Sequence, residues 1–136
     1  IQRYLVWAWG ETALADGQPA QALALAQRLI DTAINPEGSQ LPHLLKFKGE
    51  ALVALGRLTE AEAVFSQGAE AARQHETRPI WLQIEMARAR LARAQGQPRE
   101  ADRASTTARA VIEDLAATLD PPAREAFRVR ALAQLG

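Results

Sequence analysis

Two carboxylates, Glu11 and Glu50, are the residues whose type and placement come closest to an acid–base pair in this sequence. They occupy matching positions, 39 residues apart, in two copies of a repeated segment. Both are expected on helices whose axes lie about 8–10 Å apart, and no third group positions either one. The third copy carries Arg90 at the same place. We therefore interpret the residues at this position as contacts for a binding partner, and not as a catalytic pair. Their charge changes from negative in the first two copies to positive in the third.

The remaining candidates for chemistry are two histidines and a few serines. His43 and His75 lie at predicted helix margins and lack the histidine or carboxylate partner at i+4 that a helical metal site needs. Ser39, Ser66 and Ser105 have no nucleophile-elbow context, and no glycine-rich phosphate loop is present. We predict a non-catalytic protein without a metal or a cofactor.

Composition narrows the class of partner. The 136 residues include 16 basic and 16 acidic side chains, so the net charge is about zero and general affinity for nucleic acid is not expected. The chain has no cysteine, no apolar run long enough to span a bilayer and no signal-peptide pattern. We expect a cytoplasmic protein that does not contact a membrane. Because the chain begins with Ile1 and opens directly into a helical pattern, we interpret it as a piece of a longer protein.

The architecture follows from a motif that occurs three times. The copies are "GETALADGQPAQA" at 10–22, "GEALVALGRLTEA" at 49–61 and "ARLARAQGQPREA" at 89–101. Their turn glycines, Gly17, Gly56 and Gly96, are 39 and 40 residues apart. A near-constant period of this length indicates a helical repeat array. Glycine can adopt the left-handed conformation that ends a helix, and small residues on either side let neighbouring helices approach closely.

Each copy predicts a helix, a tight turn and a second helix. We expect helices near 2–15, 19–34, 41–55, 58–74, 79–95, 98–117 and 121–134. The last helix carries an apolar stripe, Ala123, Phe127, Ala131 and Leu135, and has no partner copy, so we expect it to cover the end of the array. The prediction is one all-α domain, a right-handed superhelix of three antiparallel helix pairs (2–34, 41–74 and 79–117) with a C-terminal capping helix.

The pattern resembles the tetratricopeptide repeat over residues 2–117. In that family small residues occupy the eighth and twentieth positions, a turn residue the fifteenth and a bulky apolar residue the twenty-fourth. Here the eighth position is Gly10, Gly49 and Ala89, the twentieth is Ala22, Ala61 and Ala101, and the twenty-fourth is Ala26, Phe65 and Ser105. The sequence departs from the family at the fourth position, where Val6, Leu45 and Glu85 replace the usual aromatic, and in its longer period.

The longer period and the C-terminal stretch are similar to the C-terminal helical arrays of bacterial signalling ATPases and of LuxR-type and maltose-activator-type regulators. In those proteins the array senses a ligand or a partner and restrains an ATPase or output domain. The resemblance implies a regulatory scaffold that binds a protein or peptide segment, which could be another domain of the parent chain.

The inward-facing positions of the family place four ladders of residues on a concave groove. They are Tyr4/His43/Gln83, Trp7/Lys46/Met86, Glu11/Glu50/Arg90 and Leu14/Val53/Arg93. The resemblance implies that this groove binds the partner. For single residues the alternative is that Trp7 and Met86 are buried packing and that the charges are solvated helix faces. A second function also stays open, because the apolar edge of the first helix, Leu5, Val6 and Trp9, could be buried in a homodimer.

Overall fold

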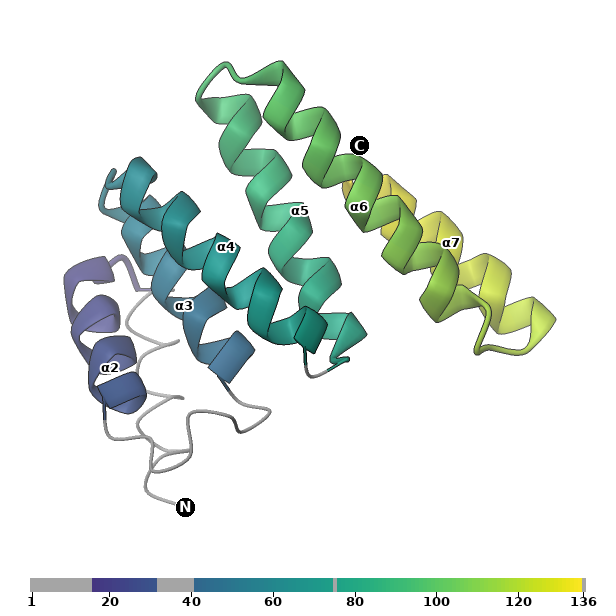
Figure 1. The fold of residues 1–136 in the computed structure, drawn as a ribbon, viewed down its shortest axis with the longest axis horizontal. Helices are drawn as coiled ribbons and strands as arrows, with labels where there is room; N and C mark the ends of the chain where they lie inside the picture. Colours follow the sequence, from purple (N-terminus) through teal and green to yellow (C-terminus); the bar gives the residue numbers. More distant parts are fainter. Residues whose placement is uncertain (1–15, 32–40, 75, 136) are drawn as a thin grey trace. The chain divides into compact units, whose positions relative to one another are not determined.

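The computed structural model of the chain describes residues 16–31, 41–74 and 76–135, and every regular element within these ranges is an α-helix (Figure 1). The helices are α2 (Pro19–Asp31), α3 (Leu41–Ala54), α4 (Leu58–Gln74), α5 (Arg78–Ala94), α6 (Pro98–Ala116) and α7 (Pro121–Leu135). Their bounds agree with the predicted ranges to within one residue wherever the predicted end falls in the described chain. The predicted helix at 2–15 and the predicted end of the second helix at 34 lie outside the described residues.

Glycines in the left-handed region end α3 and α5. Gly56 has φ +77° and Gly96 has φ +69°. After α3, the amide of Arg57 donates to the carbonyl of Leu52 at 2.9 Å and the amide of Gly56 donates to the carbonyl of Val53 at 3.0 Å. The equivalent amides after α5 form the same two hydrogen bonds at 2.9 and 3.1 Å. This is the Schellman motif, and it confirms the prediction that these glycines stop the first helix of a repeat.

Burial confirms the repeat register. The contact positions inferred from the repeats are all buried where the structure describes them. They are Gly49 and Ala89 (eighth), Ala22, Ala61 and Ala101 (twentieth), and Ala26, Phe65 and Ser105 (twenty-fourth). Because most of these side chains are small, the backbones of packed helices can approach each other closely.

The described helices belong to two compact units, residues 1–75 and residues 76–136. In the first unit α3 packs against both α2 and α4. The contact between α2 and α3 is a core of Ala22, Ala26, Phe47 and Ala51, all nearly inaccessible to solvent. The two alanines of α2 face Phe47 and Ala51 of α3, and these small side chains let the two helices approach closely.

Gly49 marks the tightest contact between α3 and α4. A Cβ atom at this position would lie 2.6 Å from Cδ1 and 2.9 Å from Cζ of Phe65. The Phe65 ring is 1% exposed, so it occupies the space that a side chain at position 49 would need. Glycine is required here by packing and not by backbone conformation.

In the second unit α5 and α6 run antiparallel, and α7 packs along α6 and also contacts α5 (Figure 1). The core that these three helices share includes Leu82 and Met86 of α5, Ile112 of α6, and Ala131 and Leu135 of α7. The last helix was expected to cover the end of the array, and within this unit it packs against the α5–α6 pair. Its predicted stripe is buried at its C-terminal half and exposed at Ala123.

Candidate partner-binding surface

One face of α3 carries four of the predicted groove positions. His43, Lys46, Glu50 and Val53 recur at spacings of three and four residues, which places them on one side of a helix. Nζ of Lys46 donates a hydrogen bond to Oε1 of Glu50 at 2.8 Å. The two side chains remain 22% and 38% exposed, so a binding partner can compete for either charge. The structure thus brings Lys46 and Glu50 together as a mixed-charge pair.

The matching face of α5 is less uniform than the repeat pattern suggests. Gln83 and Arg90 are exposed and lie seven residues apart, two turns along the same side of the helix. Arg93 is also exposed, but its Nη2 donates to the carbonyl oxygen of Leu135 at 2.7 Å and to Oγ of Ser105 at 3.4 Å. Arg93 of α5 therefore connects the end of α7 to α6 through these two hydrogen bonds.

The prediction that Met86 lines the groove is wrong. Met86 is 5% exposed and packs with Ile112 of α6 and with Ala131 and Leu135 of α7. The physical reason is that α7 lies against α5 and covers the side of the helix that the repeat pattern alone leaves open. The alternative of buried packing is the correct one for this residue.

The first members of the four ladders lie outside the described residues. These are Tyr4, Trp7, Glu11 and Leu14, and the proposed dimer edge at Leu5, Val6 and Trp9 lies there too. Their part in a groove or in a dimer stays a prediction.

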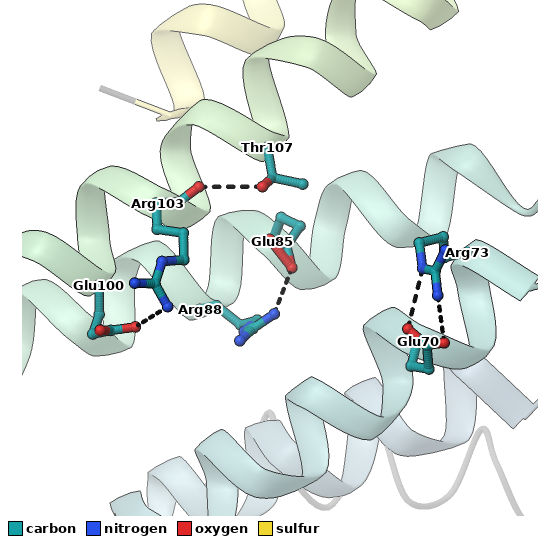
Figure 2. A network of polar contacts seen from close by, with 7 residues as sticks. All are labelled: Glu70, Arg73, Glu85, Arg88, Glu100, Arg103 and Thr107. Atoms are coloured by element: carbon teal, nitrogen blue, oxygen red, sulfur yellow. Dashed lines mark hydrogen bonds and ion pairs between the residues drawn. The ribbon is translucent and has the colours of Figure 1, made fainter.

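A buried ion pair in α5 was not expected from the sequence. Glu85 is 3% exposed, and Nη1 of Arg88 donates to its Oε1 at 2.8 Å (Figure 2). A buried carboxylate needs a charged partner, and the arginine one turn along the same helix supplies it. The signal was present in the sequence, because Glu85 departs from the apolar residue that the family has at this position and Arg88 follows at i+3.

Exposed ion pairs line the second helices of the repeats. Arg57 donates to both carboxylate oxygens of Glu60, at 2.9 and 2.5 Å, and Arg73 donates to both oxygens of Glu70, at 3.1 and 2.6 Å (Figure 2 shows the second pair). These hydrogen bonds hold the pKa of Glu60 and of Glu70 below the ordinary value, because they favour the charged carboxylate. Water screens such pairs, so they support helices locally and contribute little to the fold as a whole.

Arg103 and Glu100 form a similar exposed pair at 3.5 Å. Among the described residues, no group of three histidine, cysteine, aspartate or glutamate side chains could hold a metal ion. In the same part of the chain, the structure contains no helix with the length and apolar character needed to cross a membrane.

No family model matches the sequence. No curated protein sequence matches it significantly. The structure is similar to PcrH, solved in complex with the chaperone-binding region of PopB, with a TM-score of 0.70 and 22% sequence identity over 98% of this chain and 94% of the PcrH chain. This similarity confirms the predicted fold class, an all-α helical-repeat fold.

Proposed function

We propose that this chain is a non-catalytic scaffold that binds a peptide segment of a partner protein through the exposed face of α3 in the first unit; the equivalent face of α5 in the second unit is a separate candidate surface. The observation that carries the proposal is the Lys46–Glu50 pair, two charged side chains held at 2.8 Å at positions where helix packing does not require charge. Gln83 and Arg90 occupy matching positions in the next repeat and are exposed. The similarity to PcrH supports the proposal, because that structure contains a segment of a second protein.

The charges indicate the kind of segment that would bind. The first of these faces offers a cation and an anion side by side, whereas the second replaces Glu50 by Arg90. The α3 face is complemented by a segment that carries both an anion and a cation, and the α5 face is complemented by an acidic segment. Binding would weaken as salt is added, because exposed charges are screened.

The proposed context is a larger bacterial regulator or signalling ATPase, in which the array is one cytoplasmic domain and restrains the output domain. Its support is the resemblance of the repeat period and of the C-terminal stretch to the helical arrays of such regulators. The gene that encodes the parent chain tests this context, since a phosphate-binding loop or a helix-turn-helix beside the array would agree with it. A parent without any such domain would contradict it.

The binding proposal is tested by selecting ligands from a library of random linear peptides. The tightest peptide is then titrated by calorimetry into the native protein and into the triple variant Lys46→Ala/Glu50→Ala/Arg90→Ala. Loss of three charged contacts should weaken binding by about tenfold or more, while the melting temperature changes little because all three side chains are partly or fully exposed.

The matched control removes the same kinds of charge from the second helices. Glu70→Ala/Arg73→Ala/Arg103→Ala should leave peptide affinity unchanged, because these residues form exposed pairs on α4 and α6. If the control variant loses affinity and the α3–α5 variant keeps it, the binding face is wrong.

A further inference from the structure

A cavity of about 300 Å³ lies in the first unit, where α2, α3 and the start of α4 meet. Leu23 and Ala24 of α2 and Leu52 of α3 form its apolar lining. Lys48, Arg57 and Glu60 supply charged groups on the other side. The cavity thus combines an apolar wall with an ionic rim, a combination typical of ligand-binding pockets.

The cavity lies on a different side of α3 from the Lys46–Glu50 pair. Lys48 is two residues from each of these side chains, and two residues rotate a side chain by about 200° around a helix. A ligand in the cavity would therefore not touch the groove face of α3. The cavity is a separate site and does not depend on the proposed groove.

Lys48 is the group in the cavity that can accept a new partner. Two hydrogen bonds from Arg57 already engage Glu60. Lys48 is half-buried and lies close enough to Glu60 to attract its carboxylate, but the Lys48 ammonium forms no direct ion pair among the residues that the structure describes. The charged groups of the lining are two cations, Lys48 and Arg57, and one anion, Glu60, so the lining is positive by one charge. A half-buried ammonium beside apolar side chains favours a carboxylate ligand.

We propose that this cavity binds a short extended segment of a partner protein that carries an aliphatic side chain and a carboxylate two residues apart. The wall of α2 runs from Ala20 to Gln27, about 10 Å along the helix axis, which matches about three residues of extended chain. Side chains at i and i+2 of such a chain point to the same side. The aliphatic side chain packs against Leu23 and Ala24, and the carboxylate accepts a hydrogen bond from Nζ of Lys48.

The probes are N-acetyl-Leu-Ala-Glu-amide, the reversed N-acetyl-Glu-Ala-Leu-amide and their glutamine counterparts. Each is titrated into isotope-labelled native protein while the backbone amide shifts of Ala24 and Leu52 are followed by NMR. One of the two glutamate peptides should saturate these shifts with a dissociation constant of about 1 mM. Its glutamine counterpart should bind about fivefold more weakly, because it keeps the shape and loses the charge.

Two variants assign the charge effect to one side chain. Lys48→Met keeps the length of the side chain and should reduce the affinity for the glutamate peptide to that of the glutamine peptide. Arg73→Met removes a cation that pairs with Glu70 on α4 and should change nothing. Circular dichroism of both variants checks that helical content is retained.

Three results would overturn the proposal. The first is that neither glutamate peptide shifts Ala24 and Leu52, and the second is equal binding of glutamate and glutamine peptides. The third is that sodium acetate saturates the same shifts at the same concentration, which would assign the site to a small carboxylate. The outcome is separable from that of the groove experiment, because the Lys46/Glu50/Arg90 variant leaves all cavity residues unchanged.

Discussion

Replacing Gly49 by alanine tests the closest helix contact in the first unit. The new Cβ would lie 2.6 Å from Cδ1 of Phe65, whereas nonbonded carbon atoms prefer about 3.5–4.0 Å. The ring or the helix must therefore move by about 1 Å. Because the ring is 1% exposed, no solvent-filled space is available for that movement.

Two opposing effects set the magnitude. In an exposed helix, glycine to alanine stabilises by about 1 kcal/mol through helix propensity. Overpacking a closed core costs about 1–3 kcal/mol. The contact with Phe65 should outweigh the propensity gain, so we expect Gly49→Ala to lower the free energy of unfolding by about 1 kcal/mol. The measurement is urea unfolding followed by far-UV circular dichroism.

The same substitution made in a Phe65→Leu protein isolates the contact between residue 49 and Phe65. In Phe65→Leu the smaller side chain leaves room for the new methyl group, so Gly49→Ala should lose its cost and show a coupling of about 1 kcal/mol or more. Gly56→Ala is the control, because Gly56 has φ +77° and a Cβ there would have no neighbour within 4 Å. Its cost comes from backbone strain, about 1–2 kcal/mol, and should be the same in both backgrounds. A Gly49→Ala protein as stable as the native one, or an equal penalty in both backgrounds, would refute the packing argument.

Two further predictions concern polar contacts. Arg93→Ala removes the hydrogen bond to the carbonyl of Leu135 and should lower the local stability of the last turn of α7 by about 1 kcal/mol. Amide hydrogen exchange in this turn should therefore accelerate about fivefold, and unchanged exchange would contradict this role. In the native protein the Glu60 carboxyl should titrate below its ordinary pKa, because its hydrogen bonds with Arg57 favour the charged form. This pair stabilises the fold above the unfolded-state pKa and loses its contribution as pH falls through the lowered pKa. An NMR titration measures it, and Arg57→Gln should return the pKa toward its ordinary value; an ordinary value in the native protein would count against the bidentate pair.

The helices could be predicted from the sequence because their limits are set locally. Gly56 and Gly96 stop helices through hydrogen bonds within six residues of chain, and Pro98 and Pro121 open helices where a missing amide hydrogen costs nothing. The repeat also predicted which small residues pack, and the contact of Gly49 with Phe65 agrees with it.

The surface could be predicted only in part, because it depends on contacts between distant segments. The repeat pattern assigned Met86 to an open face, but α7 packs against that side of α5 and buries it. Arg93 is exposed as predicted, but the pattern did not indicate its hydrogen bond to the end of α7. The stripe on α7 indicated that it would cover a helix pair, not which face it would cover. The Lys48 cavity arises where three helices meet, and no spacing along one helix encodes it.

The order in which the helices pack also has a kinetic consequence. Within each unit the main contacts join helices that follow one another in the chain, namely α2 with α3, α3 with α4, α5 with α6, and α6 with α7. Contacts between residues that are close in sequence cost little loop-closure entropy. Helical proteins in which such contacts dominate fold within about milliseconds. The contact of α5 with α7, which includes the hydrogen bond between residues 42 positions apart, needs a much longer loop. We therefore expect each helix pair to form as the chain leaves the ribosome, and the docking of α7 on α5 to complete the second unit.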